Sequence, residues 1–276
     1  MKTQDLPARF RVDGGRNNIL PGVDPGSTEG TNEKHARTVL PDLVGELGGL
    51  QERLWAEHER SLLVVLQGMD TSGKDGTVKH VLGAMSPGGI AVANFKRPTQ
   101  DELAHDFLWR IRAELPGPGQ VTVFNRSHYE DIVTVRVWGL APESKWRPRF
   151  EQINAFEAEL VAAGTAVVKL FLHISYDEQR KRLLARLDRP DKRWKFDHAD
   201  LEARQRWTAF QNAYEEALSS CSSPEAPWYV IPADHKWYRN WLVATVLREE
   251  LSRMDPRYPQ PDLDLDALRR RLAPPN

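Results

Sequence analysis

The sequence predicts a three-layer α/β/α fold, in which helices cover both faces of a parallel sheet. Short apolar segments without polar alternation, such as Leu62–Leu66, are typical of strands buried on both sides. Segments with helical spacing separate them, as the crossovers of a parallel sheet require. A glycine-rich segment, Gly68–Gly76, follows the first strand and opens a helix. That combination is typical of phosphate-binding loop proteins.

The predicted elements follow one another along 276 residues. Residues 1–32, rich in Gly, Pro, Asp and Asn, predict an extended arm, either packed over the surface or partly mobile. Helical spacing starts at Glu33, although Pro41 and Gly48-Gly49 interrupt it before Arg60. Strands are then expected at 61–67, 90–95, 120–124, 165–174 and 228–231, and helices at 73–85, 101–115, 149–163, 176–187, 200–218 and 237–253. Residues 33–255 are expected to form one domain, followed by a peripheral tail, 256–276.

Composition argues against several classes of protein. The formal net charge of −1 gives no bulk attraction for nucleic acid. The longest apolar run, Leu62–Leu66, is too short to cross a membrane, and the N-terminus has no hydrophobic signal region. A single cysteine, Cys221, fits a reducing compartment. We therefore expect a cytoplasmic protein without nucleic-acid or membrane partners.

The phosphate loop, Gly68–Gly76, is the strongest functional signal. Its glycines let backbone N–H groups turn toward phosphate oxygens, and the helix that follows contributes a partial positive charge. Lys74 adds a mobile full charge for the terminal phosphates. The expected phosphate contacts in this segment are Gly73, Lys74, Gly76 and Thr77.

Two carboxylates in the loop predict a cation. Asp75 stands where Ser or Thr usually binds magnesium, and Asp70 lies within the loop. Carboxylates repel phosphates unless a cation lies between them, so Mg²⁺ is the expected cofactor and Asp70 its candidate ligand. Alternatively, one of the acids is a base that activates an attacking phosphate oxygen. Asp75 could also be simply a favourable acid in the first helical turn.

Polar residues follow the second and third predicted strands, at the edge where open α/β sheets bind ligands. Arg126 is a candidate clamp for transferring phosphates. The alternative is a surface arginine paired with Glu130 or Asp131. Lys96 and Arg97 are expected near an acceptor, and Phe95 either beside its base or in the core.

A cationic segment lies between Arg180 and Arg206, where ten basic residues stand against five acidic ones. It suits a polyanionic substrate, and a solvated helix face is the alternative. The spacing of Arg182, Arg186 and Arg189 places them on one helical face, and Pro190 then breaks the helix. We predict a lid over residues 180–206, with a mobile tip. Its candidate phosphate contacts are Arg182, Arg186, Arg189, Lys192, Arg193 and Lys195.

Three separate motifs, Gly68–Gly76, Phe124–Asp131 and Arg193–Phe196, resemble the polyphosphate kinase 2 family over roughly residues 10–255. The stretches from Phe95 and His105–Arg110 are similar to the subgroup that phosphorylates both AMP and ADP. The resemblance implies reversible transfer of a terminal phosphoryl group from inorganic polyphosphate to AMP or ADP, with Mg²⁺. It further implies adenine, or also guanine, nucleotides as partners. It also implies a thymidylate-kinase-like fold with a helical lid. The implied assembly is a homo-oligomer, either a dimer or a tetramer.

The resemblance also assigns roles. It matches Asp70, Gly73, Lys74, Asp75 and Gly76 to the family's phosphate loop, Arg126 to its arginine after the third strand, and Arg186 to its lid arginines. Many members carry Asp at the position of Asn125. Since an amide binds magnesium more weakly, metal binding shifts toward Asp70, with Glu130 or Asp131 as further candidates. The expected catalytic residues are Asp70, Lys74, Asp75 and Arg126, and the expected nucleotide contacts are Phe95, Lys96, Arg97, Asn125 and Glu130.

Two other functions remain open. One is an ATP-dependent kinase of nucleotides or of another small acceptor, because fold alone does not separate donors. The unusual Asp75 and the cationic lid favour polyphosphate. The other is a non-catalytic phosphate-binding module, against which the presence of Asp70, Lys74 and Arg126 argues.

Overall fold

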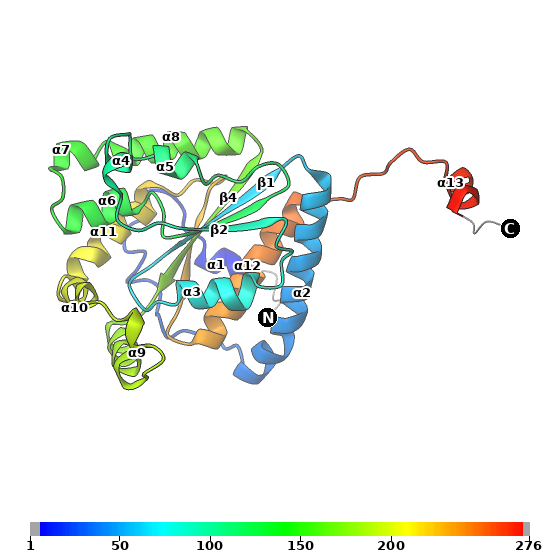
Figure 1. Ribbon diagram of the computed structural model, residues 1–276. Helices are drawn as coiled ribbons and strands as arrows, with labels where there is room; N and C mark the ends of the chain where they lie inside the picture. Colours follow the sequence, from blue (N-terminus) through cyan, green and yellow to red (C-terminus); the bar gives the residue numbers. More distant parts are fainter. Residues whose placement is uncertain (1–5, 273–276) are drawn as a thin grey trace.

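A computed structural model describes residues 6–272, which form one parallel sheet with helices on both faces (Figure 1). The strand order is β2-β3-β1-β4-β5, and every neighbouring pair is parallel. The strands are β1 (Ser61–Gln67), β2 (Ile90–Asn94), β3 (Val121–Asn125), β4 (Thr165–His173) and β5 (Trp228–Pro232). The predicted fold class is confirmed.

Alternate residues of β1 build two cores, as the two-residue period of a strand requires. Leu62, Val64 and Leu66 pack with the helices of one face, and Leu63 and Val65 with those of the other. The first face carries α2 (Glu33–Glu57) and α12 (Lys236–Met254). The second carries α6 (Glu130–Val137), α8 (Arg149–Ala162) and α11 (Trp207–Ser220) (Figure 1).

Helix α2 is continuous, so the predicted interruption at Pro41 and Gly48 is wrong. Asn32 caps its first turn by accepting a hydrogen bond from the His35 amide. The apolar face packs in the core that α2 shares with α12, and tertiary packing overrides local propensity. Gly48 has a packing role, because a Cβ there would lie 3.1 Å from the Ala84 carbonyl oxygen.

Several other helices differ from prediction. The helix expected at 101–115 is two short ones, and the helix expected at 200–218 divides at Arg206. The helix after the phosphate loop is a short α-helix followed by a π-helical turn. Helices α6 and α7 were not predicted. The remaining helices are α3 (Lys74–Thr77), η2 (Val78–Leu82), α4 (Gln100–Leu103), α5 (Trp109–Arg112), α7 (Glu143–Trp146), α9 (Tyr176–Asp188), η3 (Arg193–Lys195) and α10 (His198–Gln205).

The described part of the N-terminal arm is packed against the domain. It starts with a short helix, α1 (Leu6–Phe10), that the sequence did not predict. The Val12 amide donates to the Trp228 carbonyl oxygen at 2.9 Å. The amides of Ile19 and Leu20 donate to the Glu215 carboxylate at 2.6 and 2.8 Å. Of the two expected states of the arm, the packed one is observed; residues 1–5 lie outside the described residues.

The tail beyond α12 leaves the body and carries an unpredicted helix, α13 (Leu265–Leu272), away from the other elements (Figure 1). Residues 273–276 of the predicted tail lie outside the described residues. In the range 6–272, no helix is both long and apolar enough to span a bilayer.

Candidate active site

The phosphate loop joins β1 to α3 in a backbone conformation that needs glycine at two positions. Gly68 has φ +145° and Gly73 has φ +109°, and Thr71 between them has φ +66°. A Cβ on Gly68 would lie 2.7 Å from the Leu172 carbonyl oxygen. The loop therefore passes so close to β4 at Gly68 that a larger residue there would displace it.

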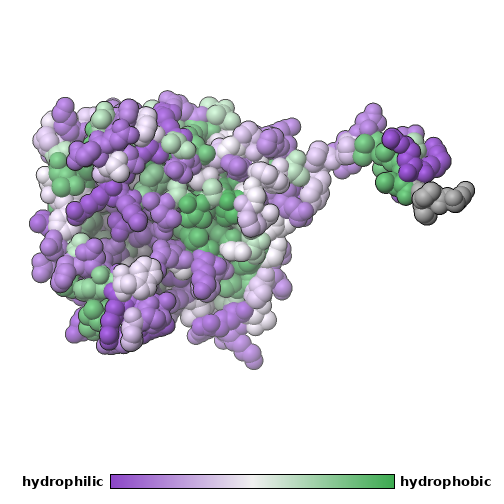
Figure 2. All heavy atoms as spheres, in the orientation of Figure 1, coloured by the Kyte–Doolittle hydropathy of each residue, from purple (hydrophilic) through white to green (hydrophobic). Residues whose placement is uncertain are grey.

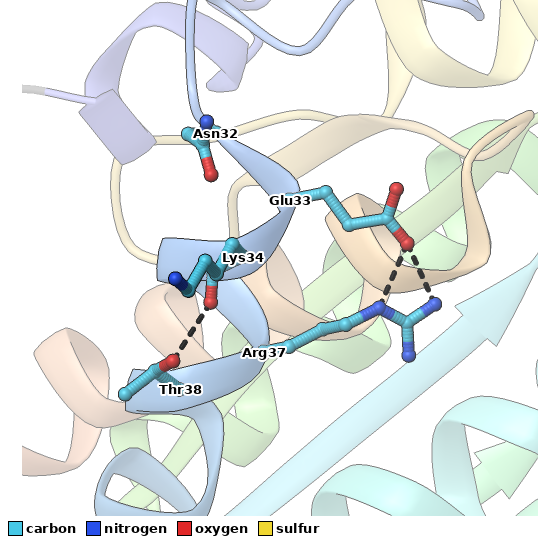
Figure 3. Close-up of a pocket in the computed structure, with 5 residues that line it drawn as sticks. All are labelled: Asn32, Glu33, Lys34, Arg37 and Thr38. Carbon is cyan, nitrogen blue, oxygen red and sulfur yellow. Dashed lines mark hydrogen bonds and ion pairs between the residues drawn. The ribbon is translucent and has the colours of Figure 1, made fainter.

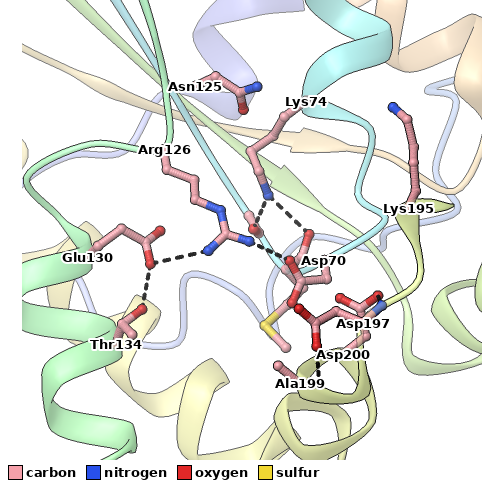
Figure 4. Close-up of polar contacts among 12 residues, drawn as sticks. Asp70, Lys74, Asn125, Arg126, Glu130, Thr134, Lys195, Asp197, Ala199 and Asp200 are labelled. Atoms are coloured by element: carbon pink, nitrogen blue, oxygen red, sulfur yellow. Dashed lines mark hydrogen bonds and ion pairs between the residues drawn. The ribbon is translucent and has the colours of Figure 1, made fainter. Parts of the chain in front are cut away.

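Lys74 is buried inside this loop, and its Nζ donates to the carbonyl oxygens of Gly68 at 2.6 Å and Met69 at 3.3 Å (Figure 4). Burial, with the nearby charge of Arg126, lowers the pKa of Lys74 to about 8. Its ammonium forms no ion pair with any carboxylate of residues 6–272. A phosphate anion would supply the missing counter-charge.

Arg126 follows β3 and faces the loop from the other side. Its Nη2 lies 2.8 Å from Asp70 Oδ1, and its Nη1 lies 3.8 Å from Glu130 Oε2 (Figure 4). The negative charge of Glu130, and to a smaller extent that of Asp70, raises the pKa of Arg126 and keeps the guanidinium charged. The predicted pairing with Glu130 is present, and the guanidinium also reaches the phosphate loop.

Asp75 links the loop to β3 and to the lid. Its carboxylate accepts from Asn125 Nδ2 at 3.0 Å and lies 2.7 Å from Lys195 Nζ. The hydrogen bond from Lys195 is the main cause that lowers the pKa of Asp75, and the hydrogen bond from Asn125 lowers it further. Asn125 also donates to Asn94 Oδ1 at 2.9 Å. The Asn125 amide is therefore a donor that orients Asp75.

The segment predicted to form a lid, residues 180–206, comprises most of α9 together with η3 and α10. Arg186 Nη1 donates to the Lys195 carbonyl oxygen at 3.3 Å and to Asp200 Oδ2 at 3.2 Å, which ties the two arms together. Arg189 and Lys192 pair with Asp191 at the exposed tip. Arg193 Nε donates to the Leu187 carbonyl oxygen.

The predicted common face of three lid arginines does not form. Helix α9 ends at Asp188, and Arg189 has an extended backbone with φ −100° and ψ 110°. Arg182 is buried, and its Nη1 donates to the carbonyl oxygens of Thr71 at 3.0 Å and Ser72 at 3.2 Å. Arg182 therefore lies behind the phosphate loop, because the base of α9 packs directly against it.

Of the predicted metal ligands, Asp70 and Glu130 flank Arg126, while Asp131 is paired elsewhere. The Asp131 carboxylate lies 3.4 Å from Arg110 Nη2 and 3.6 Å from Arg149 Nη1. Residues 6–272 contain no group of three or more His, Cys, Asp or Glu side chains that could hold a metal. Mg²⁺ bound to nucleotides commonly uses one or two carboxylates with substrate phosphates, and Asp70 with Glu130 fits that donor set.

The residues after β2 divide between core and surface. Phe95 is buried, and its ring lies 4.9 Å from that of Phe124 in an edge-on contact. Of the two expected locations, beside the nucleotide base or in the core, Phe95 therefore occupies the core. Lys96 and Arg97 are exposed at the carboxyl end of the strand. The Lys96 carbonyl oxygen accepts from Arg110 Nη1 at 2.8 Å.

Sequence reasoning missed three residues beside the loop. Gln179 Nε2 donates to the Asp70 carbonyl oxygen at 3.2 Å. Burial and the charge of Asp70 raise the pKa of Asp200. Arg239 is buried against Ser72. Only Arg239 carried a signal, as a cation shortly before the largely apolar run Trp241–Leu247 of the same helix.

A separate open recess lies beside the first turns of α2 and includes none of these residues (Figure 3). Arg37 there pairs with Glu33, and Thr38 Oγ1 donates to the Lys34 carbonyl oxygen. Glu33 thus neutralises Arg37 in this recess, which argues against a role in phosphate binding.

The lowered pKa of Lys74 predicts a pH dependence. The ammonium is charged below about pH 8 and loses its proton as pH rises through that value. Since kcat/KM reports the free enzyme, kcat/KM for the phosphoryl donor should fall above about pH 8. Initial rates across the alkaline range, at constant free metal concentration, check this. A profile that stays flat well above this pKa would contradict it.

The fold and this site define a class: a phosphate-loop protein of the phosphotransferase type, with cations from the loop (Lys74), from the end of β3 (Arg126) and from η3 (Lys195) near the loop. Comparison with known proteins narrows the class. The family model described as Polyphosphate kinase 2 matches residues 30–259, and the chain belongs to that family.

Similar proteins agree with this assignment. An "AMP/ADP-polyphosphate phosphotransferase" of Meiothermus ruber is 47% identical over 256 residues, which cover 92% of this chain and 96% of that protein. An "ADP-polyphosphate phosphotransferase" of Rhodopseudomonas palustris is 42% identical and covers 83% of each chain. The crystal structure of polyphosphate kinase 2 from Arthrobacter aurescens TC1 superimposes with a TM-score of 0.93, at 43% identity and 96% coverage of both chains.

Proposed function

We propose that this protein transfers the terminal phosphoryl group of inorganic polyphosphate to AMP and ADP, reversibly and with Mg²⁺. The observation that carries the proposal is the convergence of Lys74, Arg126 and Lys195 around the phosphate loop, where Lys74 has no carboxylate partner among residues 6–272. The family and its phosphotransferase relatives support the same activity.

The reaction breaks the terminal phosphoanhydride bond of polyphosphate and forms a bond to a phosphate oxygen of the nucleotide. Lys74 and Arg126 stabilise negative charge on the transferring group. Asp75 orients the attacking nucleotide phosphate; its lowered pKa favours orientation over proton removal. Mg²⁺, held by Asp70 and by Glu130 with substrate oxygens, would neutralise charge on the phosphates. Lys96, Arg97 and Asn125 are the proposed nucleotide contacts, from the carboxyl ends of β2 and β3.

One assay tests the function. The protein is incubated with AMP, Mg²⁺ and polyphosphate in the absence of ATP, and nucleotides are separated over time. We expect ADP first and then ATP. If ATP serves as donor to AMP while polyphosphate does not, the protein is an ATP-dependent kinase on the same fold.

The lid should bind the polyphosphate chain through separate cations, which suits a substrate with about one charge per phosphate unit. Arg186→Ala should therefore raise KM for polyphosphate by about tenfold, the cost of one charge-assisted hydrogen bond, and leave KM for AMP nearly unchanged. Arg180→Ala, at an exposed position of the same helix, is the matched control. Equal changes in both KM values would argue against a chain-binding lid.

We also propose a cytoplasmic homo-oligomer, with a second copy of this chain as the partner. Strand β2 is an edge of the sheet and exposes Val92 by 41%, and apolar residues gather over this edge toward α2 (Figure 2). Helix α13 has an exposed apolar side, with Leu265 and Leu272, and an arginine-rich side. Unpaired edges and apolar patches commonly mark interfaces. Light scattering that gives the mass of a monomer would contradict this.

A further inference from the structure

A buried arginine, Arg239, lies behind the phosphate loop and has no part in the chemistry above. It belongs to the first turns of α12 and is only 2% exposed. Its Nη1 donates to the Ser72 carbonyl oxygen at 3.1 Å, and its Nε and Nη2 donate to Asn240 Oδ1 at 3.2 and 2.8 Å. Within residues 6–272 no carboxylate forms an ion pair with it, and burial lowers its pKa to about 10. Arg239 is therefore a buried cation without a compensating anion.

A second buried guanidinium meets the same carbonyl group. Arg182, from α9, donates through Nη1 to the carbonyl oxygens of Ser72 at 3.2 Å and Thr71 at 3.0 Å. Its Nη2 donates to the carbonyl oxygens of Ala233 and Asp234 at 2.7 and 2.8 Å, just before α12. Two arginines from different helices thus hold the back of the loop.

The bond geometry gives this contact a consequence for the front of the loop. In a trans peptide, the C=O and N–H groups point in opposite directions. Fixing the Ser72 carbonyl toward the two arginines therefore turns the N–H of Gly73 to the opposite side. That N–H belongs to the first residue before α3, where helix amides bind phosphate.

The same arginine accounts for two glycines of the motif. A Cβ on Gly73 would lie 1.8 Å from Arg239 Nη1, and a Cβ on Gly76 would lie 3.1 Å from Nη2. The left-handed φ of Gly73 alone would disfavour other residues, and Arg239 removes the remaining space.

We propose that Arg239, together with Arg182, is a positioning residue for phosphoryl transfer. It holds the Ser72–Gly73 peptide with its N–H toward the donor phosphate, and it places an uncompensated positive charge behind the loop. A buried unpaired cation destabilises the free protein, and a bound polyanion supplies the missing negative charge. The inference rests on the proposed function in taking polyphosphate as that anion.

Arg239→Met tests this through binding and through turnover. Thermal unfolding is measured with and without polyphosphate, in the absence of nucleotide, so that no reaction occurs. We expect the variant without polyphosphate to melt at or above the wild-type temperature, and its polyphosphate-induced rise in Tm to be smaller. In rate assays KM for polyphosphate should rise about tenfold or more, with KM for AMP unchanged. Arg239→Lys, which keeps the charge, should restore part of the loss.

Thr245→Val is the matched control, since Thr245 is buried in the same helix and its hydroxyl donates to the Trp241 carbonyl oxygen. It should leave KM and the polyphosphate-induced rise in Tm as in the wild type. If Arg239→Met melts at a lower temperature but keeps the wild-type KM for polyphosphate and the wild-type polyphosphate-induced rise in Tm, Arg239 only stabilises the fold. That result would overturn this inference but not the proposed function. A wild-type protein with neither turnover nor a polyphosphate-induced rise would overturn the proposed function as well.

Discussion

Lys74→Met should lower kcat by at least about 10³-fold, the scale measured when one preorganised charge is removed from a transferring group. The ammonium lies within the loop and, among the described carboxylates, has no ion-pair partner, so phosphate oxygens are its available counter-charge. Methionine keeps the length of the side chain and removes the charge. Steady-state rates with saturating AMP and polyphosphate measure the effect.

The fold should survive this change. Removing an unpaired buried cation costs little or increases stability, so the Tm of Lys74→Met should be at or above that of the wild type. Lys79→Met is the matched control, at an exposed position in the π-helical turn after the loop. Near-normal turnover in Lys74→Met, or an equal loss in Lys79→Met, would remove Lys74 from the catalytic role.

Arg126→Ala should lower kcat by about 10³- to 10⁵-fold, because a guanidinium beside the transferring phosphoryl group is worth that much in related chemistry. Arg126 also separates Asp70 from Glu130, and its loss would leave two carboxylates facing the phosphates. The effect should therefore appear mainly in kcat, and kcat and KM for each substrate distinguish this.

Arg147→Ala provides the comparison for Arg126. Arg147 also bridges two carboxylates, Glu143 and Glu216, but at the exposed surface of the α7 region. Exposed pairs of this kind contribute about 0–1 kcal/mol to stability, so this variant should remain active. A comparable loss of kcat in both variants would mean that carboxylate pairing alone explains the Arg126 effect.

The sequence predicted those parts of the fold that short-range patterns determine. All five strands were found within one or two residues, because strands such as β1 are short apolar runs between turn residues. The phosphate loop was found because its glycines have local backbone requirements, which Gly68 and Gly73 show directly. Helix α2 was misjudged at Pro41, where packing against α12 outweighs local propensity.

What the sequence could not predict depends on contacts between distant segments. Arg182 has the helical spacing of a lid residue, yet it turns toward Thr71 and Ser72, over a hundred positions away. The buried Lys169–Glu157 ion pair beneath Tyr129 likewise joins β4 to α8. A charged residue gives no local signal of which neighbour it meets, so partners in the tertiary structure decide such roles.

The central claim is that the phosphate loop is the point of transfer between polyphosphate and nucleotide. Polyphosphate carrying ³²P in its terminal group tests it most directly, with AMP as acceptor and no ATP. With the wild type, we expect the label in the terminal phosphoryl group of ADP. With Lys74→Met, we expect no transfer of label to ADP. Label released only as inorganic phosphate, or transfer that Lys74→Met leaves unchanged, would contradict the account.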